Sequence, residues 1–331
     1  MSEVFIFTVN SIMPIVLIMV AGYILKMTGF FSKEFLKYGN KTVFYVCLPV
    51  MLFKNIADID DLSQIRMDVV LYTVIVIAVI WLMGLILAKT VPDRKQKGVV
   101  HQVVFRSNFA LIGVPLAELM CGSEGVKCAA VISLFSIPIF NVLAVIVLSV
   151  YKNDGAKNDV KKILKDIVTN PLILGILLGL IYAIIKNAFK DIFVDSFFSR
   201  LTFVKTSIDY ISRSATPLAL LVLGGQFDFN RIKGMKRQLI TGLIGRNLIA
   251  PLIGVGIAAF LTLSGKIDFG RDVFAALISL FATPVAVASA IMAEAMDNDG
   301  QLAGQFVVWS TLVSVLSLFI TIFLVRAAGL L

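Results

Sequence analysis

The sequence predicts an all-α polytopic membrane protein: ten transmembrane helices in two inverted five-helix repeats, in which the broken helices 4 and 9 cross. Three observations lead to this fold: an excess of apolar residues, ten apolar runs of spanning length, and a repeated spacing of prolines. Of the 331 residues, 59% are hydrophobic and 15% are charged, whereas soluble domains have roughly 45–50% and about 25%. Because one water-soluble core stops growing near ~250–300 residues, this composition excludes a soluble enzyme, a disordered chain and a disulfide scaffold.

Ten apolar runs follow one another along the chain, each near the ~17–25 residues that a spanning helix needs. The first is preceded by Glu3 and followed by Lys26, the reverse of the charge order of a cleaved signal peptide, so we expect it to remain as a helix. The seventh is the weakest, because Asp209 and Arg213 interrupt its first half. The runs cover residues 5–25, 38–56, 69–91, 99–120, 126–151, 167–185, 203–227, 239–263, 273–295 and 302–324.

Lysines and arginines are distributed unevenly among the segments that join the runs. With the N-terminus outside the cell, 17 of the 30 fall in segments that face the cytoplasm, ten in segments that face outward, and three within runs. Positive charge favours the cytoplasmic side, so we expect a multi-pass protein of the cell membrane with both termini outside. The same bias accounts for the net charge of +9. No basic stretch is interleaved with aromatic residues, and we expect no nucleic-acid partner.

Three pairs of prolines recur at nearly constant separation. Their separations are 157, 168 and 169 residues, for Pro14 and Pro171, Pro49 and Pro217, and Pro115 and Pro284. The spacing predicts a first five-helix repeat over 1–151, a short cytoplasmic linker over 152–166 and a second repeat over 167–331. Because five spans is an odd number, the second repeat must be inverted, as in many secondary transporters.

The fourth and ninth runs contain helix-breaking residues in their middle. Gly113 and Pro115 predict a break in the fourth run, and Thr283 and Pro284 predict one in the ninth. Freed backbone groups at membrane depth must be satisfied by protein or by a water-filled cavity, and half-helix N-termini there suit an anion. Two ordinary proline kinks are the alternative. Taken together, the breaks predict one polar substrate site near the midplane.

Of three polar side chains within the runs, two are candidates for that site and the third, Arg106, is not. Asn108 can donate to a carboxylate, or it can link two helices as a structural amide. Arg246 can hold an organic anion through its planar fork, or it can brace a helix end through backbone carbonyls. Arg106 starts nearer the inner face, and we expect it to snorkel to the surface.

Three acidic residues, one in the seventh run and two after the breaks, are candidates for coupling to an ion. Asp209 is spaced i,i+4 from Arg213, which predicts a local ion pair, but an unpaired Asp209 would be the candidate for proton coupling. Glu118 and Glu294 follow the two breaks near opposite surfaces, and either could titrate during transport. With one histidine and three scattered cysteines, we expect no catalytic residues, no metal site, no cofactor and no enzymatic activity.

The chain resembles the auxin efflux carrier family of transporters almost from end to end. No single motif is diagnostic, but the set in this order is specific. In chain order the motifs are Asn40-(x)8-Pro49, Arg106-Ser107-Asn108-(x)4-Gly113-x-Pro115, Asn170-Pro171, Arg246-(x)4-Pro251, Thr283-Pro284, Leu302-Ala303-Gly304-Gln305 and Ser310-Thr311-Leu312-Val313-Ser314.

The resemblance implies a scaffold part and a transport part, drawn from both repeats, that move past each other like an elevator. It implies small organic anions as substrates: auxin in plants, and malonate, malate or lactate in bacterial members. In the plant exporters an asparagine matching Asn108 contacts the substrate carboxylate, and that role carries over. Asn170 is carried over as a binding residue too, but Leu172 replaces a second asparagine of the family pattern, which disfavours an auxin-like pose. The short linker is similar to bacterial members, and the distantly related bile acid sodium symporters are sodium-coupled.

The sequence therefore favours a secondary transporter of a small mono- or dicarboxylate. Its expected partners are the organic anion and the lipid bilayer, with a homodimer, proton coupling and sodium coupling left open. A passive anion channel and a ligand-binding membrane sensor without flux are the alternatives. The chain lacks the Gly-(x)4-Gly-Lys-Ser/Thr loop that would bind a nucleotide.

Overall fold

The computed structural model describes residues 2–57, 66–152, 165, 168–188, 202–227 and 234–331. The predicted linker lies almost wholly outside these residues. Within them the regular structure is helical, apart from one isolated antiparallel β-bridge. The first half comprises α1 (Ser2–Met27), α2 (Lys33–Thr42), η1 (Val43–Cys47), α3 (Leu48–Ala57), α4 (Met67–Lys89), α5 (Arg94–Phe105), η2 (Phe109–Gly113) and α6 (Val114–Lys152). The second half comprises α8 (Pro171–Ala188), α11 (Thr202–Gln226), α12 (Lys236–Ile244), η4 (Gly245–Ile249), η5 (Leu252–Gly256), α13 (Ile257–Leu263), α14 (Arg271–Phe281), α15 (Val287–Ala295) and α16 (Gly300–Ala327).

Helices coincide with all ten predicted apolar runs. Four helical segments of the described chain are long and apolar enough to cross a membrane: α4, α6, the continuous stretch Lys236–Leu263, and α16. Val16–Met27 and Pro171–Lys186 are shorter apolar helices. These segments are those of a multi-pass membrane protein, while the count of ten spans stays a prediction.

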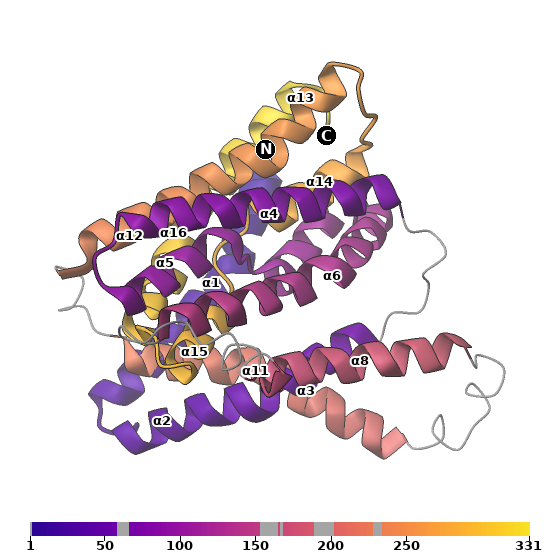
Figure 1. Cartoon of the computed structure of the whole chain (residues 1–331). Helices are drawn as coiled ribbons and strands as arrows, with labels where there is room; N and C mark the ends of the chain where they lie inside the picture. The colour runs from indigo at the N-terminus through magenta and orange to yellow at the C-terminus, as the bar shows by residue number, and fades with distance from the viewer. Residues whose placement is uncertain (1, 58–65, 153–164, 166–167, 189–201, 228–233) are drawn as a thin grey trace.

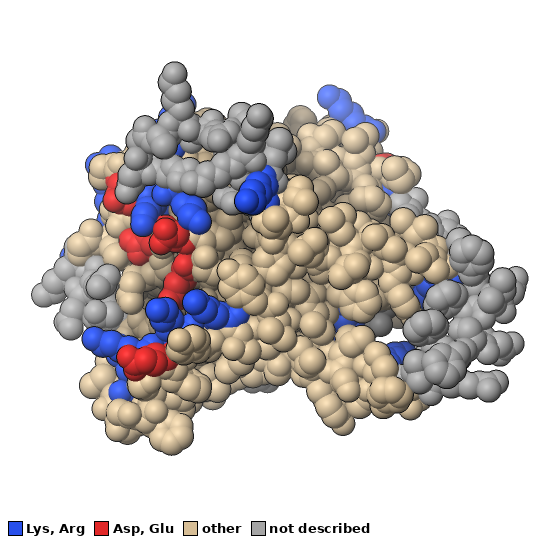
Figure 2. Space-filling model, turned by 60° about the horizontal axis from the view of Figure 1, so that its bottom comes forward, with Lys and Arg blue, Asp and Glu red and all other residues tan. Residues whose placement is uncertain are grey.

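The helices form two layers, seen edge-on in Figure 1. The lower layer consists of α2, α3, α8 and α11, the upper layer of α4, α5, α6, α12, α13, α14 and α16, and α1 and α15 lie between them. Viewed from below, the lower layer presents a broad uncharged surface, with Lys, Arg, Asp and Glu gathered mainly toward one end (Figure 2). A surface of this kind suits contact with lipid.

Close helix contact in the lower layer depends on two glycines of α8. A Cβ atom at Gly175 would lie 2.5 Å from the carbonyl oxygen of Pro49, and one at Gly179 would lie 2.9 Å from that of Phe53. The glycines are four residues apart, so both lie on the helix face that meets α3. Small residues at this spacing let membrane helices approach closely without a hydrophobic driving force.

Wide π-helical turns precede three of the prolines, Pro49, Pro115 and Pro251, and the chain stays helical through each of them. The turn η1 ends one residue before Leu48-Pro49, and η4 ends one residue before Ala250-Pro251. In η2 the amide of Val114 donates to the carbonyl of Phe109, one residue further back than in an α-helix. A wider turn absorbs the hydrogen bond that proline cannot donate.

The predicted position of the break in the fourth run is therefore wrong. The chain is helical at Gly113 and Pro115, and it breaks instead at Arg106–Asn108, between α5 and η2. Beyond Pro115, α6 bends at Gly122, whose φ of 57° favours glycine. In the ninth run the break spans 282–286 and includes Thr283 and Pro284, as predicted. Pro115 and Pro284 therefore do not occupy equivalent positions.

Candidate functional site

The two breaks meet and pair through one antiparallel β-bridge and the hydrogen bonds that flank it. The amide of Asn108 donates to the carbonyl of Pro284 (2.8 Å), and the amide of Ala286 donates to the carbonyl of Arg106 (3.3 Å). Between these bonds, Ser107 and Val285 form the β-bridge. Segments nearly 180 residues apart thus satisfy each other's backbone at the centre of the bundle, as irregular backbone at membrane depth requires.

Arg246 of η4 holds the two helices that end at this crossing. Its side chain is completely buried, and its five N–H groups match five carbonyl oxygens at the ends of α5 and α14. Carbonyls at a helix C-terminus lack intrahelical donors and carry partial negative charge, so one guanidinium stabilises both ends. The acceptors are Thr283 (3.0 Å, from Nε), Val104 and Phe105 (3.4 and 3.3 Å, from Nη1), and Leu280 and Phe281 (3.3 and 2.6 Å, from Nη2).

Two helices start on the other side of the crossing, and the residues that carry their first amides line a cavity. The N–H groups of Phe109 and Ala110 at the start of η2, and of Val287 and Ala288 at the start of α15, donate to no acceptor within the described part of the chain. All four residues line the cavity. Paired helix N-termini with open amides form a favourable environment for an anion.

The cavity has a volume of about 750 Å³ and lies between the crossing, α1, α3, α6, α8 and α11. Its buried end is polar and is formed by Arg106, Ser107, Asn108 and Asn141, each at most 8% exposed. Its exposed end carries an ion-paired cluster: Asp209 Oδ2 lies 2.7 Å from Arg213 Nε, and Asp209 Oδ1 lies 3.5 Å from Lys54 Nζ. Apolar side chains form most of the wall between the two ends, among them Leu48, Met51, Leu52, Phe140, Leu172 and Leu220.

Of the seven predicted binding residues, Asn108 and Pro115 line this cavity. The Asn108 side chain is 8% exposed and makes no hydrogen bond to another described residue. Its amide therefore remains available to a ligand. Pro115 contributes an apolar surface beyond the start of η2.

The other five predicted binding residues lie outside the cavity lining. Arg246, Thr283 and Pro284 stabilise the crossing, because their hydrogen bonds run to backbone groups of the broken helices. Gly113 permits close packing of η2 on α14, since a Cβ there would lie 2.7 Å from the carbonyl oxygen of Ser279. Asn170 caps α8 by accepting a 2.9 Å bond from the amide of Leu172.

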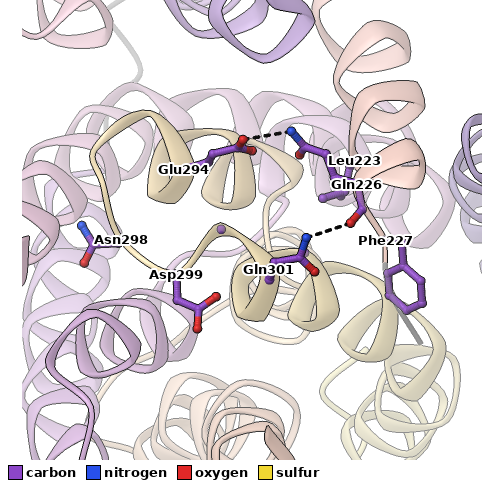
Figure 3. A pocket seen from close by; sticks show the side chains of 9 residues that line it. Leu223, Gln226, Phe227, Glu294, Asn298, Asp299 and Gln301 are labelled. Carbon is purple, nitrogen blue, oxygen red and sulfur yellow. Dashed lines mark hydrogen bonds between the residues drawn. The ribbon is translucent and has the colours of Figure 1, made fainter. Parts of the chain in front are cut away.

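A second cavity, of about 270 Å³, lies near the last turn of α11 and is lined by nine residues of α11, α15, α16 and the segments that directly follow α11 and α15 (Figure 3). Glu294 of α15 accepts hydrogen bonds from Asn40 Nδ2 of α2 (2.6 Å) and from Gln226 Nε2 of α11 (3.0 Å). Gln301 Nε2 of α16 donates to the carbonyl of Gln226 (3.0 Å). At 1.5 Å per residue, Gln226 lies about 26 Å along α11 from Asp209. The two cavities thus lie toward opposite ends of the layers, and polar contacts join the layers at the smaller one.

The other two acidic candidates differ from Glu294 in their surroundings. Asp209 is ion-paired with Arg213, as its spacing predicted, and it also contacts Lys54, from another helix. Glu118 is an exposed residue of α6 that lines neither cavity. Among the three, Glu294 is the carboxylate that bridges α15 to the lower layer.

Arg106 and Asn141 are site residues that the sequence analysis did not assign. The expectation that Arg106 snorkels is wrong: the side chain is 4% exposed and lines the buried end of the cavity. Its depth was misjudged because the fourth run breaks at Arg106 itself, which places the residue at the crossing rather than near a membrane surface. Asn141 had a usable signal, since an amide within the apolar run 126–151 needs a partner just as Asn108 does.

Comparison with known proteins finds similarity to transporters over nearly the whole chain. A family model described as "Membrane transport protein" matches residues 7–322. An uncharacterized transporter of Methanothermobacter thermautotrophicus is 26% identical over 325 residues, covering 95% of this chain and 97% of the relative. An uncharacterized transporter of Methanocaldococcus jannaschii is 24% identical over 267 residues, covering 77% and 80%.

Proposed function

The chain belongs to the membrane transport protein family, which confirms the resemblance to the auxin efflux carriers, and from this premise we propose that it is a secondary transporter of small organic anions. Its substrates are mono- or dicarboxylates such as malonate, malate or lactate, or an auxin-like acid. It acts in the cell membrane with both termini outside. The observation that carries the proposal is the cavity at the crossing, where Asn108 and two helix N-termini face the same space.

The chemistry of the cavity supports an anionic substrate. Its charged lining residues are Lys54, Arg106 and Arg213 against Asp209, a formal charge of +3 − 1 = +2. The four open amides and the Asn108 side chain add hydrogen-bond donors at the buried end. Donors and positive charge in an apolar enclosure favour a carboxylate, because electrostatic attraction is stronger where water is excluded.

The layered arrangement supports alternating access by an elevator-type motion. We propose that the crossing and the helices it joins move as one body against the lower layer, because Arg246 ties the ends of α5 and α14 together. The larger cavity opens beside Lys54 and Asp209, at the predicted outer end. At the predicted inner end the contacts of Glu294 with Asn40 and Gln226 join the layers. Those contacts must break for the inner side to open, which makes Glu294 the proposed site of proton coupling.

Uptake into proteoliposomes tests the proposal. We expect saturable uptake that is accelerated by substrate on the opposite side, as a carrier requires. Unsaturable flux with single-channel steps would instead indicate a channel, and binding without flux would indicate a sensor.

A pair of asparagine variants tests the site. Asn108→Ala should abolish uptake while the protein stays folded in detergent. Asn170→Ala removes an amide that caps α8 outside the cavity, so it should lower thermal stability and retain uptake. Unchanged transport by Asn108→Ala would remove that residue from the site, and loss of transport by Asn170→Ala in a folded protein would return Asn170 to it.

A further inference from the structure

We propose that Arg106 is the charge partner of the transported carboxylate and that Asn141 positions its guanidinium. This inference rests on the proposed function and deepens it, because it assigns the substrate's negative charge to one side chain. Neither residue was assigned to the substrate by the sequence or by the resemblance.

The two buried arginines differ in how many of their hydrogen-bond donors the protein itself uses. Arg246 matches five N–H groups with five carbonyl oxygens, so its hydrogen-bonding capacity is used within the protein. The Arg106 side chain makes two hydrogen bonds to described residues, from Nη2 to Asn141 Oδ1 (2.7 Å) and from Nη1 to Met292 Sδ (2.8 Å). A guanidinium has five N–H donors, so three donors of Arg106 remain without an acceptor in the described chain. Arg246 does not line the cavity, whereas Arg106 does.

The Arg106 guanidinium has no charged partner among the described residues. Both partners of the Arg106 side chain are neutral, an amide oxygen and a thioether sulfur, and no carboxylate of the described residues forms an ion pair with it. The acidic residue that lines the same cavity, Asp209, is ion-paired with Lys54 and Arg213 at the exposed end. Buried charges are normally paired, because removing a charge from water without a partner is costly. The counter-charge of Arg106 is therefore expected to come from the contents of the cavity.

The Arg106 guanidinium is also held in a fixed orientation. Asn141 donates from Nδ2 to the carbonyl of Ile137 (2.8 Å), so its Oδ1 is turned toward Arg106. The Arg106 backbone is anchored as well, since its carbonyl accepts the amide of Ala286. A fixed guanidinium beside Asn108 presents a planar set of donors, which matches a carboxylate better than a spherical anion.

The experiment measures thermal unfolding of the purified full chain in detergent, with sodium formate as the smallest carboxylate probe. Formamide serves as the neutral analogue, and sodium chloride at equal concentration controls for ionic strength. We expect formate to raise the unfolding temperature of the wild type, and formamide and chloride to do so far less. Absence of a formate effect, or an equal effect of chloride, would overturn the proposal.

Three variants separate a binding role from a structural one. Arg106→Gln should raise the half-saturating formate concentration about tenfold or more, while its unfolding temperature without formate stays equal to or above that of the wild type, because an uncompensated buried charge is removed. Arg106→Lys should keep part of the formate effect. Asn141→Leu should weaken formate binding with the charge still present. Equal formate binding by Arg106→Gln and the wild type would refute the inference.

The outcome is independent of the proposed function. Formate protection that depends on Arg106, in a protein that gives no saturable flux, would keep the binding site and reject the transporter. Saturable flux that is unchanged in Arg106→Gln would do the reverse.

Discussion

The bracing of two helix ends by Arg246 leads to a quantitative prediction. Arg246→Met keeps a long apolar side chain but removes all five N–H donors, leaving five buried carbonyl oxygens without their partner. A buried polar group left unsatisfied costs ~1–3 kcal/mol. Taking the lower bound for each carbonyl, we expect a loss of about 5 kcal/mol in the free energy of unfolding, similar to the ~3–5 kcal/mol for breaking a buried ion pair.

Arg246→Lys tests the same interaction with fewer donors and predicts a smaller loss in the free energy of unfolding. A lysine ammonium has three donors and no planar fork, so it can serve at most three of the five carbonyls. The two that remain predict a loss of about 2 kcal/mol. The free energy of unfolding should therefore fall from arginine to lysine to methionine at position 246. This order is characteristic of hydrogen bonding to carbonyls, because lysine would meet a requirement for charge alone.

Unfolding in mixed micelles, followed by loss of helical circular dichroism, measures these free energies. Arg326→Met is the matched control, because Arg326 is exposed in the last turn of α16. We expect that variant to stay within about 0.5 kcal/mol of the wild type, as for most surface substitutions.

Two results would refute the reasoning. If Arg246→Met unfolds within about 1 kcal/mol of the wild type, the five hydrogen bonds do not stabilise the crossing to the extent that burial implies. If Arg246→Lys folds but weakens formate binding as much as Arg106→Gln does, Arg246 contacts the anion directly and the assignment of the two arginines must be exchanged.

Two further predictions concern the layers. Glu294→Gln places an amide donor opposite the amide donors of its two partners. We therefore expect the maximal uptake rate and its dependence on pH to change, while the half-saturating substrate concentration stays the same. A change confined to the half-saturating concentration would place Glu294 in the substrate site. Gly179→Ala should cost ~1–3 kcal/mol, because its Cβ would lie 2.9 Å from the carbonyl oxygen of Phe53. Gly256→Ala, where the nearest atom is 3.7 Å away, should have no such cost in a thermal unfolding assay, and equal losses would contradict the packing argument.

Several features of the site were accessible from local sequence because they depend on short-range chemistry. The break at Thr283 and Pro284 lies where it was predicted. The helix ends at Phe281, and no π-helical turn there lets it continue through the proline. The ion pair of Asp209 with Arg213 follows from one helical turn of separation. Asn108 was selected because an amide in an apolar run needs hydrogen-bond partners, and it does line the cavity.

Other predictions were wrong because contacts with a segment distant in the sequence determined the structure. Pro115 predicted a break, but the π-helical turn η2 allowed the helix to continue, and the break moved to Arg106–Asn108, where the other broken segment supplies hydrogen-bond partners. This displacement also moved Arg106 from an expected surface position to the buried end of the cavity. Local propensity cannot anticipate a partner that comes from nearly 180 residues away.

By itself the sequence determined that this protein resides in a membrane, where its helices lie and which two runs carry polar interruptions. These properties follow from composition and from spacing within a single helix, because a spanning segment must bury apolar side chains and satisfy its own backbone. Only the tertiary structure decided which buried arginine braces the fold and which faces the cavity. Both are cations within apolar runs, and they differ in whether carbonyl groups of distant helices surround them.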